Sequence, residues 1–407
     1  MMQPPQPRSL TIHLIAAEES GDALGAALAR ALVEREGDAV RLGGVGSGGM
    51  AAAGIVSPFP IDDLSIIGAT AIPRRLPIIL RRIRATADAV IAARPDALVI
   101  IDSPDFTHRV ARRVRRHAPS IPIIDYVSPT VWAWRPWRAR AMRRYVDCVL
   151  AILPFEPAVH ERLGGPPCVY VGHPLTERVA ELRPNAEDKQ RRDNDPPLIL
   201  VLPGSRASEI RRLLAIFGDA IALVAAGVGA IDVVLPTMPH LLARVLEGVA
   251  GWAVQPRIVV DPAEKWAAFR KARAALAASG TVTLELALAG IPTVAAYRIP
   301  AIEYVVAQAA RRPELFSIIL ANLVLGEKIV PELLQRDCTP EKLADALVPL
   351  LTGTPARRRQ IEAFGRLDSI MGIGRAAPSS KAAAIVLDLA RRGRSAMTDI
   401  RGNAPSW

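Results

Sequence analysis

Two short apolar runs, each stopping at a turn of small residues, constrain the fold more than any other feature. The first covers 198–202 and ends in Pro-Gly-Ser-Arg206, and the second covers 274–278 and ends in Ser-Gly-Thr281. Both pass into a helix-like pattern, which is how a parallel strand presents the N-terminus of a helix to a ligand. Unpaired N–H groups, the helix dipole and the guanidinium of Arg206 together suit a diphosphate. Further along the second helix, the carboxylate of Glu285 can accept hydrogen bonds from a sugar diol.

A single turn of this kind is ordinary in α/β proteins, where Glu285 would merely favour the N-terminal half of a helix. Two turns together with Arg206 favour the ligand-binding interpretation.

Other short apolar runs predict further strands, each followed by a turn or a helical pattern. They cover residues 10–16, 96–101, 121–127, 146–153, 168–171, 231–235, 258–260 and 293–297. At 407 residues the chain exceeds what one core usually supports, so we expect two domains. The expected fold class is α/β, with two facing Rossmann-like domains that each hold a parallel sheet.

The expected N-terminal domain covers residues 1–180, and the expected C-terminal domain covers 198–365. Between them, 181–197 is polar, proline-flanked and without apolar periodicity, which is typical of a linker. Residues 366–407 should hold a C-terminal helix and then, from Arg391 on, a loose tail. The stretch Leu42-Gly-Gly-Val-Gly-Ser-Gly-Gly49 lacks the spacing of a dinucleotide fingerprint, so we expect a flexible turn there.

The charge balance points to an anionic partner. The chain has 51 Lys and Arg against 40 Asp and Glu, a formal charge of +11, which suits a phosphate, a nucleic acid or an acidic membrane surface. Cys148, Cys168 and Cys338 lack metal-ligand or redox spacing, so we expect a reduced cytosol. Asp193-Asn-Asp195 lies in the expected linker with no strand before it, so we expect no metal there. The N-terminus is polar and proline-rich, which does not suit a signal peptide, and no apolar run is long enough to cross a bilayer.

Polar residues follow several of the predicted strands. Because ligands of open parallel sheets bind at the carboxyl ends of strands, we expect these residues to line one crevice. They are Glu18, Asp102, Ser128, Glu156 and His173. Taken singly, each is also the kind of residue that fills a solvated loop.

Residues 66–84 have an amphipathic pattern. A helical wheel places Leu76, Ile79, Leu80 and Ile83 on one stripe and Arg75, Arg81, Arg82 and Arg84 on the other side. Such a helix can lie on a membrane surface, or it can be an ordinary surface helix whose stripe faces the core. The pattern leaves both interpretations open.

Three tryptophans, at 132, 134 and 137, lie among five arginines. Aromatic and basic residues together can stack bases and follow a phosphate backbone, which keeps a single-stranded nucleic-acid binder among the alternatives. No RNA- or DNA-binding module accompanies them. We expect these tryptophans to pack a loop or hold an apolar substrate, and no nucleic-acid partner.

Several motifs, matching in order from about residue 11 to 385, resemble the lipid-A-disaccharide synthase family. They are Ala16-Ala-Glu-Glu-Ser-Gly-Asp22, Tyr126-Val-Ser-Pro-Thr-Val-Trp-Ala-Trp-Arg135, Leu153-Pro-Phe-Glu156, Gly172-His-Pro174, Leu202-Pro-Gly-Ser-Arg206, Ser279-Gly-Thr-Val-Thr-Leu-Glu285 and Val330-Pro-Glu-Leu-Leu-Gln335.

The resemblance implies an inverting, metal-independent glycosyltransferase with twin Rossmann-like domains (GT-B type) and no cofactor. Its donor nucleotide would bind the C-terminal domain and its acceptor the N-terminal one. It would join UDP-2,3-diacylglucosamine to 2,3-diacylglucosamine 1-phosphate in lipid A biosynthesis, giving the β-1,6 disaccharide 1-phosphate and UDP. The implied location is the cytoplasm, peripheral on the cytoplasmic face of the inner membrane, with an anionic membrane surface and a possible second copy of the chain as partners.

Carried over by motif, Asp102 would be the general base. The acceptor-side residues would be Glu18, Ser20, Asp22 and Ser128. The donor-binding residues would be Gly204, Ser205, Arg206, Ser279, Gly280, Thr281, Glu285 and Asn322. The expected membrane-facing residues are Ile79, Leu80, Arg81, Arg82, Ile83 and Arg84.

The chain departs from the family motif at three positions. Ala17 and Glu19 stand where the first motif usually has Gly and Ala, and Thr107 stands where the motif after Asp102 usually has Asn. A nucleotide-sugar epimerase would share the donor site but would need neither the amphipathic stretch nor a second sugar site. A nucleic-acid binder would leave the two Gly/Ser turns and Glu285 without a role.

Overall fold

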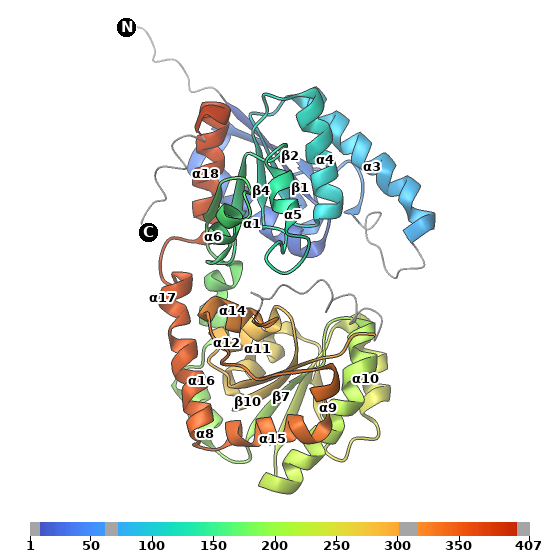
Figure 1. Cartoon of the computed structure of the whole chain (residues 1–407), viewed down its shortest axis with the longest axis vertical. Coiled ribbons are helices and arrows are strands. Elements are labelled where there is room, and N and C mark those ends of the chain that lie inside the picture. Colours follow the sequence, from blue (N-terminus) through green and yellow to red (C-terminus); the bar gives the residue numbers. More distant parts are fainter. Residues whose placement is uncertain (1–8, 62–71, 301–315, 397–407) are drawn as a thin grey trace. The chain divides into compact units, whose positions relative to one another are not determined.

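The computed structural model describes residues 9–61, 72–300 and 316–396 of the chain, which divides into two compact units. Unit 1 comprises Met1–Pro174 together with Arg375–Trp407, and unit 2 comprises Leu175–Gly374. Each unit is built on one parallel sheet (Figure 1). The predicted α/β fold class with two parallel sheets is confirmed.

The sheet of unit 1 forms because its strands are apolar on both faces, as strands covered by helices on both sides must be. All five side chains of β3 are buried, for example. The strands are β1 (Leu10–Ala16), β2 (Val40–Val45), β3 (Ala97–Ile101), β4 (Ile123–Tyr126), β5 (Cys148–Ala151) and β6 (Cys168–Tyr170), in the order β2-β1-β3-β4-β5-β6.

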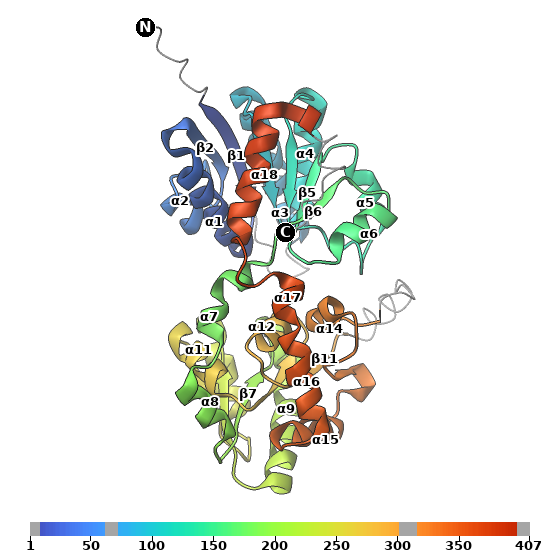
Figure 2. The same cartoon turned by 90° about the vertical axis from the view of Figure 1, so that its left-hand side faces the viewer.

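Helices cover both faces of this sheet. Helices α1 and α18 pack together over one face, as Figure 2 shows, while α3 and α4 pack over the other. The helices of unit 1 are α1 (Glu19–Glu36), α2 (Gly48–Ala52), α3 (Ile72–Ala93), α4 (Pro104–His117), α5 (Trp137–Met142), α6 (Glu156–Arg162) and α18 (Pro378–Arg392), with short 3₁₀ turns at Gly37–Ala39 and Gly393–Ala396.

The sheet of unit 2 has a related plan. Its strands are β7 (Leu198–Leu202), β8 (Asp232–Pro236), β9 (Arg257–Val259), β10 (Ala274–Ala278), β11 (Thr293–Tyr297) and β12 (Glu332–Leu334), in the order β12-β11-β10-β7-β8-β9. Helices α9, α10 and α15 share one apolar core with β7, β8 and β10.

The helices of unit 2 are α7 (Val179–Leu182), α8 (Ala186–Asp193), α9 (Ala207–Val228), α10 (Leu242–Val249), α11 (Pro262–Lys271), α12 (Val282–Leu288), α14 (Leu320–Leu325), α15 (Pro340–Leu351), α16 (Pro355–Gly365) and α17 (Leu367–Met371). Its 3₁₀ turns cover Pro174–Arg178, Pro239–Leu241 and Gln335–Asp337.

Two sequence expectations are corrected in unit 1. The stretch 42–49 is not a flexible turn, because its first half belongs to β2 and its end starts α2. The C-terminal helix α18 belongs to the core of unit 1, and the described chain continues beyond it through a 3₁₀ turn where a loose tail was expected. The rest of that tail, 397–407, lies outside the described residues.

The expected linker, 181–197, is corrected as well, because it contains helix α8. Asn185 caps this helix: its side chain accepts a hydrogen bond from the amide of Asp188, and the Asp188 carboxylate accepts one from the amide of Asn185. Arg270 of α11 then contacts the Asp188 carboxylate at 3.0 Å. The polar residues of the segment therefore fix it within unit 2.

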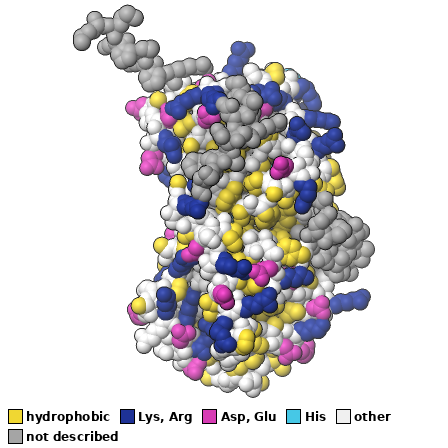
Figure 3. All heavy atoms as spheres, turned by 60° about the vertical axis from the view of Figure 1, so that its left-hand side comes forward, with side chains coloured by type: hydrophobic (Ala, Val, Ile, Leu, Met, Phe, Trp, Pro, Cys, Tyr) yellow, Lys and Arg dark blue, Asp and Glu magenta, His cyan; other side chains and the backbone are white. Residues whose placement is uncertain are grey.

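Lys and Arg side chains are spread over both units on the face drawn in Figure 3. Basic side chains are thus not confined to one unit on this face. Within the three described ranges, no helix is both long and apolar enough to cross a bilayer.

Candidate active site

In each sheet the strand order reverses once, and this determines where a ligand should bind. The reversal lies between β1 and β3 in unit 1 and between β7 and β10 in unit 2. Ligands of open α/β sheets bind beside such a switch point, at the carboxyl ends of the two strands. The strand ends are level, since Ala16 pairs with Ile101 and Leu202 with Ala277.

The predicted residues fall at these two switch points. Glu18 and Ser20 follow β1 and Asp102 follows β3, while the Gly204 and Gly280 turns follow β7 and β10. The Oγ of Ser20 lies 3.4 Å from Asp102 Oδ2, so the structure brings the first turn of α1 close to the turn after β3.

The turn at Asp102 has an unusual backbone. Asp102 and Ser103 have φ angles of 50° and 44°, the left-handed region that disfavours residues other than glycine. Each such residue costs about 1–3 kcal/mol, and such strain clusters at functional sites. The turn is held by α4, where the Thr107 hydroxyl donates to the Asp102 carbonyl at 2.6 Å. Thr107, which departs from the family motif, therefore still makes a hydrogen bond at this turn.

Asp105, the rival base, points elsewhere. Pro104 is the first residue of α4, and the exposed carboxylate of Asp105 accepts a hydrogen bond from Arg138 at 2.8 Å. Of the two carboxylates, only Asp102 lies at the strand end.

Asp22 has a structural role that differs from the one predicted. Its buried carboxylate accepts hydrogen bonds from the amides of Ser47, Gly49 and Met50 at 2.6, 2.7 and 3.2 Å. A Cβ added at Gly49 would lie 2.7 Å from this carboxylate, which explains a glycine there. Asp22 thus secures the loop after β2, and Glu18 and Ser20 remain the exposed acceptor-side candidates.

Ser128, Glu156 and His173 do not line an open crevice. Their exposed fractions are 4%, 2% and 6%. The Ser128 hydroxyl donates to the Pro129 carbonyl at 2.9 Å and lies 2.8 Å from His160 Nε2, so we assign the proton of that second contact to the histidine. The carboxyl ends of β4, β5 and β6 therefore carry a buried polar cluster.

Burial also sets the charge of this cluster. It raises the pKa of Glu156 to about 8 and lowers the pKa values of His160 and His173 to about 4. All three side chains are therefore mainly uncharged at neutral pH.

The turn after β7 is already filled by a carboxylate that the sequence interpretation missed. Glu209 Oε2 accepts hydrogen bonds from the amides of Ser205 and Arg206 at 2.9 and 3.2 Å, so these amides are not free for a diphosphate. Arg206 and Glu209 have the spacing of a capping box, and this spacing is the sequence signal from which the contact could have been predicted. The Arg206 guanidinium contacts Glu209 Oε1 at 3.3 Å. Because it is also 76% exposed, it remains accessible to an anion. The expected anion site is thus reduced to this side chain.

The turn after β10 is more open. Gly280 and Thr281 are exposed, while the Ser279 hydroxyl donates to the Ile318 carbonyl at 3.5 Å. Glu285 is paired with Lys265 at 3.1 Å, and the Lys265 ammonium lies 4.0 Å from the centre of the Trp266 ring. Neither Lys265 nor Trp266 was predicted, because they come from α11, far from the motif.

Asn322 is corrected from a donor contact to a structural residue. It is fully buried, and its amide donates to the Val330 carbonyl at 2.9 Å and to Glu332 at 3.0 Å. Its oxygen accepts hydrogen bonds from the amides of Ile329 and Val330. All its hydrogen-bonding capacity fixes the segment that leads into β12.

The predicted membrane-facing set divides into two groups. Ile79 and Ile83 are buried in the core shared with α4, so those two assignments are wrong. Arg82 lies over the Phe59 ring at 4.5 Å. The exposed side chains near the start of α3 are Leu76, Ile78, Leu80, Arg81 and Arg84. Residues 62–71 of the amphipathic stretch lie outside the described residues.

The three tryptophans have different environments. Trp132 packs edge-on against Phe155 at 5.5 Å between ring centres, as expected for a loop-packing residue. Trp134 and Trp137 are 44% and 67% exposed, so they do not pack the loop, and the alternative that they hold an apolar substrate stays a prediction.

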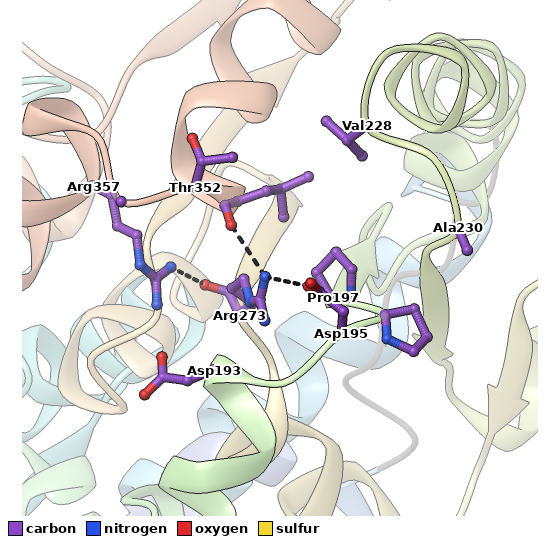
Figure 4. Close-up of a pocket in the computed structure, with 11 residues that line it drawn as sticks. Asp193, Asp195, Pro197, Val228, Ala230, Arg273, Thr352 and Arg357 are labelled. Atoms are coloured by element: carbon purple, nitrogen blue, oxygen red, sulfur yellow. Dashed lines mark hydrogen bonds and ion pairs between the residues drawn. The ribbon is translucent and has the colours of Figure 1, made fainter.

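A cavity of about 710 Å³ lies away from the predicted site (Figure 4). Arg273 and Pro197, which line it, directly precede β10 and β7, so the cavity is at the amino ends of these strands. There Arg273 donates to Asp195 at 2.9 Å, and Arg357 donates to the Arg273 carbonyl at 2.6 Å. Asp195 of the Asp193-Asn-Asp195 motif is therefore ion-paired with Arg273.

The comparisons with solved structures agree with this fold. A glycotransferase of kitacinnamycin has a TM-score of 0.60 at 18% identity over 94% of this chain and 99% of that one. The UDP-GlcNAc 2-epimerase of Neisseria meningitidis bound to UDP-GlcNAc has a TM-score of 0.57 at 12% identity, covering 94% and 99%. At these identities the likeness shows the fold alone.

Sequence relatives are far closer. The lipid-A-disaccharide synthase of Nitrobacter hamburgensis is 61% identical over 95% of this chain and 97% of its own length. That of Bradyrhizobium diazoefficiens is 60% identical over 97% and 100%. The family model for lipid-A-disaccharide synthetase matches residues 12–384. The chain belongs to the lipid-A-disaccharide synthetase family.

Proposed function

We propose that the chain transfers the sugar of UDP-2,3-diacylglucosamine to the 6-hydroxyl of 2,3-diacylglucosamine 1-phosphate, with Asp102 as the general base. The observation that carries the proposal is the position of Asp102 on a strained turn at the switch point of unit 1. Family membership supports the reaction, and the switch points support the division into an acceptor unit and a donor unit.

In the proposed step, the Asp102 carboxylate takes the proton of the acceptor hydroxyl as its oxygen attacks the anomeric carbon of the donor. The bond from that carbon to the diphosphate breaks, and UDP leaves with the electron pair. Attack opposite the leaving group inverts the anomeric centre and gives the β linkage. The exposed Arg206 guanidinium would bind the diphosphate, and Glu285 would accept hydrogen bonds from donor hydroxyls.

Both substrates carry acyl chains, so we also propose that the chain works at a membrane surface on the cytoplasmic side. The start of α3 combines exposed apolar side chains, Leu76, Ile78 and Leu80, with exposed Arg81 and Arg84. This combination suits the interface of an anionic bilayer.

The variant Asp102→Asn tests the base. It keeps the shape of the side chain but removes its basicity, so kcat should fall by roughly 10²–10⁴ while UDP affinity stays near that of the wild type. Asp105→Asn is the matched control and should retain its turnover. Near-normal turnover in Asp102→Asn, or an equal loss in Asp105→Asn, would overturn the assignment. UDP release should require both substrates, whereas an epimerase would act on the donor alone.

A further inference from the structure

A buried His–Asp pair joins helix α4 to strand β4 directly beside the turn that carries Asp102. His108 Nε2 lies 3.2 Å from Asp125 Oδ2, and the two side chains are 5% and 1% exposed. Asp125 is level with Ile100 of β3, two residues before Asp102. The amide of Asp102 in turn donates to the carbonyl of Tyr126 at 3.1 Å. The pair therefore links α4, the helix that follows the turn, to β4, the strand to which the Asp102 amide is hydrogen-bonded.

A chain of hydrogen bonds fixes the orientation of the histidine. Arg112 Nη2 donates to the Tyr145 hydroxyl at 3.1 Å, and that hydroxyl lies 3.1 Å from His108 Nδ1. Because a guanidinium can only donate, the hydroxyl is free to give its own proton to Nδ1. The Nε2 atom then carries the ring hydrogen, and it is this atom that lies within ion-pair distance of Asp125 Oδ2.

The His108–Asp125 pair is an inefficient way to stabilise the fold, because burying a charged group costs free energy. Burial raises the pKa of Asp125, which reflects the cost of a charge there, and His108 opposes that shift. Apolar residues of similar volume usually replace such pairs without loss of stability. A role other than stability accounts better for a polar pair in this core.

We infer that the His108–Asp125 pair positions the Asp102 carboxylate, an inference that rests on the proposed role of Asp102 as the base. The strained turn is held by the first turn of α4, where the amides of Phe106 and Thr107 donate to the Ser103 carbonyl at 2.9 and 3.1 Å. His108 is the next residue, and its contact with Asp125 locks this part of α4 against β4. Without the lock, α4 can shift and Asp102 can leave its left-handed conformation.

The test is the double variant His108→Leu/Asp125→Leu, which removes the pair without leaving either partner buried alone. We expect a folded protein whose kcat falls roughly ten- to hundredfold, because small displacements of a reacting group have effects of this size. The KM values of both substrates should change less than about threefold, since neither residue touches them. His108→Gln, whose amide can donate to Asp125, should recover much of the lost kcat.

The matched control is Arg115→Met, which breaks the buried pair of Arg115 with Asp147 at the far end of the same helix. It should lower the thermal midpoint and leave kcat near that of the wild type. Wild-type kcat in the double variant, or an equal loss of kcat in Arg115→Met, would overturn the inference. If the double variant does not fold, Asp125→Ala, which removes the acceptor without adding bulk beside the uncharged imidazole, replaces it under the same criteria.

The parent proposal fails separately. Near-normal turnover in Asp102→Asn would show that Asp102 is not the general base. An inactive Asp102→Asn beside a fully active double variant would remove only the positioning role of the pair.

Discussion

Replacing Glu156 by Gln should stabilise the protein by an amount that grows with pH. Glu156 is 2% exposed, and burial raises its pKa from 4.5 to about 8. The folded state therefore keeps the proton up to about pH 8, whereas the unfolded chain loses it above pH 4.5. Its contribution to stability is complete below pH 4.5 and is lost progressively as the pH rises towards 8.

The size of the effect follows from this window. Each pH unit inside it costs about 1.4 kcal/mol, so the wild type loses about 3 kcal/mol from this group between pH 5 and pH 7. A glutamine resembles the protonated acid, cannot ionise, and can accept the hydrogen bond that Leu153 donates to Glu156 at 3.0 Å. The difference in the free energy of unfolding between variant and wild type should therefore rise by about 3 kcal/mol over these two units.

Urea denaturation followed by circular dichroism at pH 5, 6 and 7 measures this difference. The buried histidines of the same cluster titrate in both proteins, so their effect cancels in the comparison. Glu161→Gln, an exposed residue of the same helix, is the control and should give a pH-independent difference. A constant difference for Glu156→Gln between pH 5 and pH 7 would show that the group is ionised in the folded state and refute the reasoning.

Three further predictions concern ligands. Arg206→Ala should weaken UDP binding by about ten- to hundredfold in calorimetric titrations, with partial recovery in Arg206→Lys, and unchanged binding would remove the diphosphate contact. Arg81→Glu/Arg84→Glu should release the protein from anionic vesicles in cosedimentation, most at low salt, whereas Arg211→Glu/Arg244→Glu in unit 2 should not; retained binding would move the docking surface elsewhere. Labelled oligouridine should bind only weakly at physiological salt, and tight binding lost in Trp134→Ala/Trp137→Ala would instead support a nucleic-acid partner.

The sheets could be predicted from the sequence because parallel strands are apolar along their whole length. Strand β2 was not predicted because it contains Gly43 and Gly44, and consecutive glycines are typical of a turn. Gly44 has φ 141°, and a Cβ there would lie 1.8 Å from the Leu14 carbonyl oxygen of β1. A glycine is required at this position because β1 and β2 approach closely there. The sequence around Gly44 does not reveal this, because β1 is remote from it along the chain. The short strand β12 was missed because Glu332 and its neighbours carry no apolar period.

The location of the candidate site could be predicted, but the hydrogen bonds within it could not. Motif position correctly placed Asp102 and the two Gly/Ser turns at strand ends. Whether a polar group is free depends on the backbone that folds against it. Asp22 is occupied by amides more than twenty residues away, and the Ser205 amide by Glu209. Sequence spacing revealed the polar residue in each case and not its partner.

Helix α3 shows why both interpretations of its pattern were needed. A wheel of Leu76, Ile79, Leu80 and Ile83 gives one continuous stripe, yet only Ile79 and Ile83 are buried. Figure 1 shows the start of α3 extending away from the rest of the described part of unit 1, where Leu76 and Leu80 are exposed. The same stripe is core along most of the helix and open surface at its beginning. Exposed apolar side chains beside Arg81 and Arg84 suit the anionic membrane surface that we propose as the partner of this helix end.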